Sequence, residues 1–406
     1  MGMKLRSKIS RNMRRQIKKI IHKKKSGTDS LPFLERIGMH LFHRFSKKHA
    51  LLPKPAFDDK ISSSDEALFT IEKQTARRAS IAGALSATCS ALAFLYADPL
   101  LPMDDSSQVT WGSIAEYWLI VGSVIIVATT LEIIYLYWDG IRAVHQMSLK
   151  VPIAMSTISD ERHYVLRALV RAALELPNPT DSVINVDPHK ETSKIKIIVA
   201  ALVYKSKIAL TNFMVKMLIK KLLGRAALRG WLEFIAIPIT AIWNYVVSRY
   251  VMREASTRIR GPATVSEIFS HILAAHGPLS DQSKELILRA VVSAIVRSSD
   301  FHPNVYYLYH LVAAKMDETS LAHLDDSQRF IDVLSRAGKS DKALALQVLV
   351  VASIIDGKLP RKEKKLLEES FGVCHVAYDV SHIKLLKKRF LQGHQITIEN
   401  LGKIIC

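Results

Sequence analysis

Cysteine is scarce in this chain of 406 residues, and the three present, Cys89, Cys374 and Cys406, lie far apart. That spacing supports neither a disulfide framework nor a four-thiolate zinc site. Common catalytic signatures are missing as well: the sequence has no Gly-x-Gly-x-x-Gly, Gly-x-Ser-x-Gly or His-Glu-x-x-His, and Val333 stands where a phosphate loop at Gly338 needs its first glycine. These absences argue against an enzyme, and we identify no catalytic residue.

Acidic residues are absent from residues 1–28, which hold eleven lysines and arginines, and are rare in residues 192–260, which hold thirteen bases against two acids. The formal net charge of +20 therefore belongs to two segments rather than to the whole surface. No apolar core follows the first segment, so it does not resemble a secretory signal. We expect residues 1–63 to form a basic arm with a short helix, whose Arg14 and Arg15 bind anionic lipid. Nucleic-acid binding or a mitochondrial presequence is the alternative, and nucleic acid is the less favoured partner.

Long apolar runs indicate a membrane protein. Residues 79–97 contain no charged side chain, and residues 117–138 contain only Glu132. Each run is long enough to cross a hydrocarbon core about 30 Å thick, at about 1.5 Å of rise per residue. Aromatic side chains mark both ends of the second run, as they do at membrane interfaces. We therefore predict a transmembrane helical hairpin within residues 64–150.

The loop between the two runs contains no lysine or arginine, whereas Arg77 and Arg78 precede the first run and Arg142 follows the second. By the positive-inside rule, the N- and C-termini are then cytoplasmic, at a bacterial inner membrane. Small residues recur every four positions in the first run, at Ala79, Gly83, Ala87 and Ala91. Because such a face allows close helix packing, we expect it to contact the second run, a partner protein or another copy of the chain.

Two acids interrupt the apolar regions: Glu132 in the second run and Glu233 in a third run, residues 231–250. Charge is costly in lipid, so both are candidates for functional acids, and they would serve an alternative function as a transporter or channel accessory. Glu132 lies six residues from Trp138, so a side chain that reaches the interface is the simpler interpretation. Glu233 and Pro238 favour a kinked, re-entrant or protein-buried helix over a plain third span.

Between the second and third runs, we expect a helix and a proline-rich loop in residues 151–191, and basic membrane-associated helices in residues 192–261. Lys194, Lys205 and Lys216 are eleven residues apart, which is close to three helical turns, so they form one stripe on a helix. This pattern is typical of a helix in a membrane interface, where the lysines bind anionic lipid. A helix with a solvated basic face, packed on its own domain, is the alternative.

Residues 262–406 show no strand-like alternation, and we predict a soluble helical bundle there. This region contains a weak internal repeat, formed by residues 290–311 and 349–370. In each copy an apolar helix ends near an acid, Asp300 or Asp356, and a short turn with a proline leads into a second helix. Two such helical pairs can close on each other as one bundle.

The second copy contains the run Ile355-Asp356-Gly357-Lys358-Leu359-Pro360-Arg361-Lys362-Glu363. This run resembles the signature of the tellurite-resistance TerB-like helical domain, and the resemblance covers residues 264–372. It implies an all-helical bundle that binds a divalent cation, such as Ca²⁺ or Mg²⁺, often in membrane stress-response or envelope complexes. Asp356 and Glu363 match the ligand positions. Lys358 and Lys362 stand where the family has acids, which leaves fewer than the roughly six to eight oxygens that Ca²⁺ prefers. A purely structural Asp-Gly turn is the alternative.

The whole arrangement resembles bacterial membrane proteins that join a small-residue-rich hairpin, a segment like residues 224–244 and such a helical tail. We therefore expect an all-α protein with a transmembrane hairpin, basic amphipathic helices and a soluble C-terminal bundle. Its function would be that of a membrane-tethered module that mediates interactions or senses stress.

Overall fold

The computed structural model describes residues 33–50, 61–97, 111–151, 159–176, 178, 229–314, 324–394 and 396–403. Within these residues the chain is helical and contains no strand, which confirms the predicted all-α class. The proposed lipid-binding residues Arg14, Arg15, Lys194, Lys205 and Lys216 lie outside the described residues.

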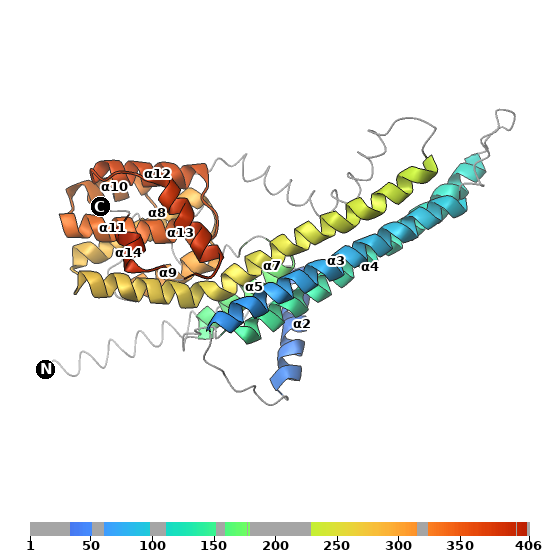
Figure 1. Ribbon diagram of the computed structural model, residues 1–406, viewed down its shortest axis with the longest axis horizontal. Coiled ribbons are helices and arrows are strands. Elements are labelled where there is room, and N and C mark those ends of the chain that lie inside the picture. Colours follow the sequence, from blue (N-terminus) through green and yellow to red (C-terminus); the bar gives the residue numbers. More distant parts are fainter. Residues whose placement is uncertain are drawn as a thin grey trace.

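Three long helices lie side by side and form a rod: α3 (Ile61–Ala97), α4 (Trp111–Lys150) and α7 (Arg229–His276) (Figure 1). The helix α3 runs away from the C-terminal domain, and α4 and α7 run back towards it. All three are long and apolar enough to cross a membrane. The predicted run 79–97 lies in the half of α3 that is farther from the C-terminal domain, and most of the run 117–138 lies in the corresponding half of α4.

The predicted third run, residues 231–250, and the predicted segment boundary at residue 261 both lie within the long helix α7. It is one helix from Arg229 to His276 and continues through both Pro238 and Pro262. A proline removes one backbone donor and disfavours a helix interior. Here the long contact with α3 and the contact with the C-terminal domain hold the helix together through both positions.

Two shorter helices, α2 (Phe33–Ala50) and α5 (Ser159–Ala173), pack on the half of the rod nearer the C-terminal domain. Their buried side chains share a hydrophobic core with α4 and α7, for example Phe42, Met147, Val170 and Met252. The helix α2 lies across the rod rather than along it (Figure 1).

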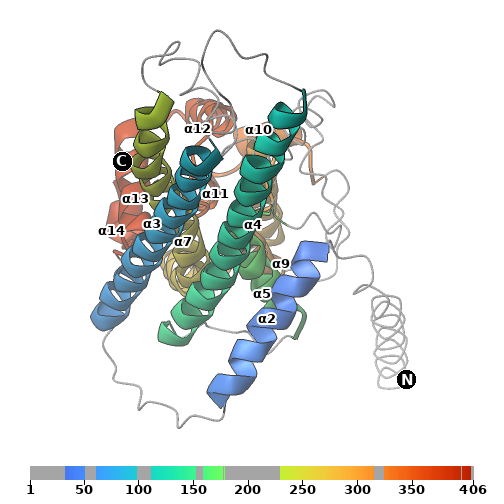
Figure 2. The ribbon, with the colours of Figure 1, turned by 90° about the vertical axis from the view of Figure 1, so that its right-hand side faces the viewer.

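The end of α7 and seven further helices share a second hydrophobic core, which defines the C-terminal domain. These helices are α8 (Asp281–Ser298), α9 (Pro303–Ala313), α10 (Ser327–Arg336), α11 (Lys339–Ile354), α12 (Arg361–Val373), α13 (Val380–Leu391) and α14 (Ile398–Gly402). Most of α8 and α11 is buried, which explains why both are apolar on nearly every side. Figure 2 shows the domain behind the rod when the molecule is viewed from the opposite end.

Candidate functional site

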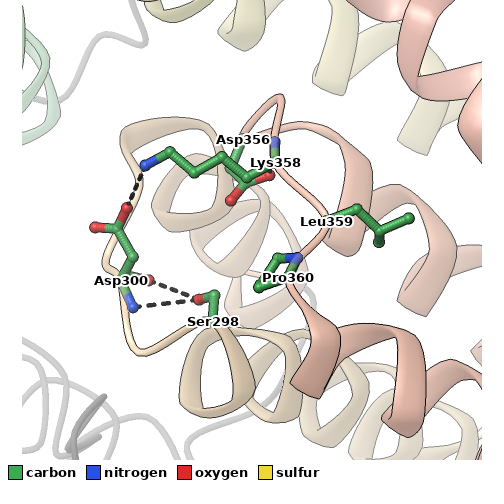
Figure 3. Close-up of a pocket in the computed structure, with 6 residues that line it drawn as sticks. All are labelled: Ser298, Asp300, Asp356, Lys358, Leu359 and Pro360. Carbon is green, nitrogen blue, oxygen red and sulfur yellow. Dashed lines mark hydrogen bonds and ion pairs between the residues drawn. The ribbon is translucent and has the colours of Figure 1, made fainter. Parts of the chain in front are cut away.

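The two turns of the internal repeat lie next to each other in the C-terminal domain, and a cavity of about 350 Å³ lies between them (Figure 3). The first turn follows α8 and holds Asp300, and the second follows α11 and holds Asp356 and Lys358. The cavity is lined by Ser298, Asp300, Asp356, Lys358, Leu359 and Pro360. The acid of each repeat copy therefore reaches the same pocket, which we call the turn pocket.

Asp300 is held by donors from two distant segments. Lys358 Nζ lies 2.9 Å from Asp300 Oδ2, and Asn178 Nδ2 donates to Asp300 Oδ1 at 2.6 Å. Asp356 instead closes its own turn, because its Oδ1 accepts a hydrogen bond of 2.7 Å from the backbone N–H of Lys358. Gly357, between them, has a φ of +74°, a conformation that favours glycine. The pocket thus joins both repeat turns to the segment after α5.

Asp300 and Lys358 form a charged pair across the turn pocket. Burial alone would raise the pKa of Asp300, but the charges of Lys358 and His302 outweigh burial and lower it. Burial also opposes the charge of Lys358, yet Asp300 and other nearby carboxylates raise the pKa of Lys358 above its ordinary value. The Lys358 side chain is 46% exposed, so solvent screens the pair and limits its contribution to stability.

Glu363, in the first turn of α12, is 1% exposed, and among the described residues its Oε2 atom has no hydrogen-bond partner. Burial raises the pKa of Glu363 to about 9, and the neighbouring Asp356 and Asp300 carboxylates contribute to the increase. Burial also raises the pKa of Asp356. Because an unpaired buried charge is costly, Glu363 holds its proton at neutral pH.

The structure buries the two expected metal ligands, Asp356 and Glu363, close enough for their charges to interact. Across the described part of the chain, however, no group of three or more His, Cys, Asp or Glu side chains is arranged to hold a metal ion. Two carboxylates, one of which closes its own turn, fall short of the roughly six oxygens that Ca²⁺ or Mg²⁺ requires. The residues present therefore do not fit a hard-cation site, and Asp356 has the geometry of a turn residue.

Ion pairs and hydrogen bonds connect α7 to the neighbouring helices beside the turn pocket. Arg258 pairs with Glu254 one turn earlier, at 2.9 Å, and its Nη1 donates to the backbone oxygen of Ala168 in α5 at 2.6 Å. His302, which caps α9, places Nε2 3.3 Å from Glu254 Oε1. The long helix is thereby bonded to α5 and to the first repeat turn.

Asn304 connects α7 to the second repeat turn. It is fully buried, and its Nδ2 donates to the backbone oxygen of Thr257 at 3.1 Å and to that of Ile355 at 2.7 Å. A Cβ atom at Gly261 would overlap the Asn304 side chain. The Gly-Pro pair at 261–262 therefore marks the close approach of α9 to α7 rather than the end of a helix.

The structure describes the surroundings of one of the two candidate membrane acids, Glu132, but not those of the other, Glu233. Glu132 is buried between the rod helices, and Asn244 Nδ2 of α7 donates to its Oε1 at 2.6 Å. The side chain therefore points between the rod helices. Gly83 of α3 has no side chain, and the Asn244 side chain occupies the space that a Cβ atom at residue 83 would need. Glu233 belongs to α7, but its side chain lies outside the described residues.

The small-residue face of the first run is buried within the chain. Ala79, Ala87 and Ala91 are almost fully covered, and Gly83 lies against Thr240 and Asn244 of α7. The sequence predicts contact with the second run, a partner protein or another copy of the chain, whereas Gly83 lies against the third apolar run in α7. A partner protein or a second copy would therefore meet a different face of the rod.

Comparisons of the chain with protein-family models, with curated proteins and with solved structures found no match. The TerB-like resemblance accordingly stays an expectation that rests on the residues quoted for it.

Proposed function

We propose that this chain is an integral protein of a bacterial inner membrane, in which α3, α4 and α7 cross the bilayer and the C-terminal domain acts as a cytoplasmic TerB-like module. The outer surface of the rod supports this most directly, because large apolar side chains are exposed on all three helices. They include Ile81, Leu85 and Leu92 of α3, Leu119, Ile126, Leu131 and Ile134 of α4, and Phe234, Ile242 and Val246 of α7. Such a surface would be unfavourable in water and is favourable in lipid.

The charged and apolar halves of the three helices are in register. Arg78 of α3 forms a salt bridge of 3.0 Å with Asp139 of α4, and the guanidinium of Arg249 in α7 lies 5.8 Å from the ring of Phe69 in α3. Beyond this charged layer, away from the C-terminal domain, α3 carries no further charge up to its end. One plane through the charged layer can therefore be the cytoplasmic interface for all three helices.

The contacts of each part of the chain indicate on which side of the proposed membrane it lies. The helix α2 packs on α5 at the charged end of the rod, and Asn178 after α5 contacts Asp300 of the C-terminal domain. Both ends of the described chain thus lie at the lysine- and arginine-rich end, which the positive-inside rule places in the cytoplasm. The helix α4 ends at this charged end of the rod, whereas α7 begins at the opposite end.

Continuity of α7 supports a role in communication between the membrane and the cytoplasm. The same helix contacts Glu132 through Asn244 and enters the core of the C-terminal domain at Ile268 and Phe269. A shift of α7 within the bilayer would therefore move the domain, and binding of a partner to the domain would act back on the rod. We propose that this domain mediates interactions or senses stress, with the turn pocket beside α7 as its recognition site.

Cysteine accessibility tests the topology. In a background with Cys89, Cys374 and Cys406 replaced by Ser, one variant carries Asp104→Cys in the connection between α3 and α4, and the other carries Leu385→Cys in the C-terminal domain. We expect a membrane-impermeant maleimide to label position 104 in intact cells and position 385 only after permeabilisation. Equal labelling of both positions in intact cells, or of neither, would contradict the proposed hairpin.

A further inference from the structure

The helix α2 is fixed at the depth of the charged layer. Its side chains Phe42 and Phe45 pack on α4, with ring centroids 5.1 Å apart for Phe42 and His145 and 6.4 Å apart for Phe45 and Trp138. Trp138 is the last residue of the second apolar run, and the guanidinium of Arg142, one turn later, lies 5.4 Å from its ring. These contacts hold α2 where the proposed bilayer meets the cytoplasm.

One side of α2 is covered by other helices, and the opposite side is open. Gly38 lies against Val170 and Leu174 in and after α5, and Glu35 is bonded to Arg167 and Arg171 of α5. Viewed from the apolar end of the rod, α2 lies beside α4 and in front of α5 (Figure 2). The uncovered side of α2 therefore faces away from both α4 and α5.

The open side of α2 combines apolar and basic side chains without an exposed acid. Phe33 is 68% exposed and Ile37 is 41% exposed, and the exposed positions continue along the same face with Arg36, His40, His43, Arg44 and Lys47. Spacings of three and four residues place them on one stripe of a helix. Glu35 is the only acid in α2, and it is buried in its pairs with α5. The open face is therefore positive and apolar at once.

We propose that this face of α2 binds the surface of an anionic phospholipid bilayer. Phe33 and Ile37 would insert among the acyl chains near the headgroups, and Arg36, Arg44 and Lys47 would contact lipid phosphates, which is how interfacial amphipathic helices bind. Charge complementarity alone would also fit an acidic protein. The position of α2 beside Trp138, where the second apolar run ends, favours the lipid surface. The proposal rests on the membrane insertion of the rod proposed above.

Depth-dependent quenching in the full-length protein tests this assignment. Single cysteines in the cysteine-free background carry an environment-sensitive nitrobenzoxadiazole probe, and the protein is placed in nanodiscs of mixed phosphatidylglycerol and phosphatidylcholine with one of the two lipids brominated. We expect a probe at Ile37→Cys to be quenched about threefold more by brominated phosphatidylglycerol than by brominated phosphatidylcholine. Leu385→Cys is the matched control, because Leu385 is 47% exposed on the C-terminal domain and should be quenched by neither lipid.

A probe at Ile126→Cys on α4 separates the two proposals, because it should be quenched by both lipids if the rod is inserted. Quenching at 126 with none at 37 would overturn the role of α2 and leave the membrane insertion standing. Loss of quenching at 126 would overturn both. Replacing Arg36, Arg44 and Lys47 together by Gln should bring the lipid ratio at 37 close to one while quenching at 126 stays unchanged, and an unaltered ratio would refute binding through these bases.

Discussion

Replacing Glu363 by Gln should stabilise the C-terminal domain at neutral and alkaline pH and change little near pH 4. Burial, together with the neighbouring Asp356 carboxylate, raises the pKa of Glu363 from 4.5 to about 9. Between these values the folded protein keeps a proton that the unfolded chain has released, so the free energy of unfolding falls as the pH rises. Gln has nearly the same shape and no proton to lose, and this pH dependence should disappear in the variant.

The size of the effect follows from the pKa difference. Each unit corresponds to about 1.4 kcal/mol, so the wild-type domain should lose about 1.4 kcal/mol of stability per pH unit within the window. At pH 7 the accumulated loss is about 3 kcal/mol, which is a large share of a typical folding free energy of about 5–15 kcal/mol. The variant should recover most of that loss.

Hydrogen exchange measured by mass spectrometry on the full-length protein in detergent can follow this loss in peptides from α12. After correction for the intrinsic exchange rate, the free energy of opening should be lower at pH 8 than at pH 5.5 in the wild type, and this difference should be much smaller in Glu363→Gln. Glu368→Gln, at an exposed position of the same helix, is the control and should behave as the wild type. A wild-type opening energy that does not change with pH would refute the assignment of a neutral buried carboxyl.

Two further substitutions test the packing of α7. Gly261→Ala should destabilise the C-terminal domain by about 1–3 kcal/mol in thermal denaturation, because the new Cβ would overlap Asn304. The control Gly372→Ala has open space around it and should be neutral or stabilising. A change in stability that is equal in the two variants would contradict the close approach of α9 to α7. Asn244→Ala should weaken the rod by about 1 kcal/mol in a dodecyl sulfate titration, because it leaves Glu132 buried without its donor. Adding Glu132→Leu should restore stability, and a further loss would refute the pairing.

The sequence predicts those features that depend on residues close together in the chain. Hydropathy and length place the apolar runs of α3 and α4, since both are properties of one continuous segment. Local residues also mark two helix starts: the Ser280 side chain caps α8, and Pro360 directly precedes the first residue of α12. The internal repeat also identifies Asp300 and Asp356 as equivalent, although nothing in it shows that their turns share a pocket.

The remaining features depend on contacts between distant residues. Asn178 reaches Asp300 across 122 positions, and Asn244 reaches Glu132 across 112, so no local pattern reveals either pair. The spacing of Glu132 from Trp138 likewise gives no sign of its hydrogen-bond donor, Asn244 of α7. Packing on α9 likewise overrides the helix-breaking signals at residues 261–262.

The central claim is that α7 crosses the bilayer as the third helix of the rod and continues into the C-terminal domain. A probe at Ile242→Cys, an exposed position of α7 in the apolar half, tests it most directly in the brominated nanodiscs. The account predicts that quenching at position 242 equals that at position 126 of α4. Quenching as weak as that at position 385 would show that α7 lies outside the lipid and would contradict the proposed architecture.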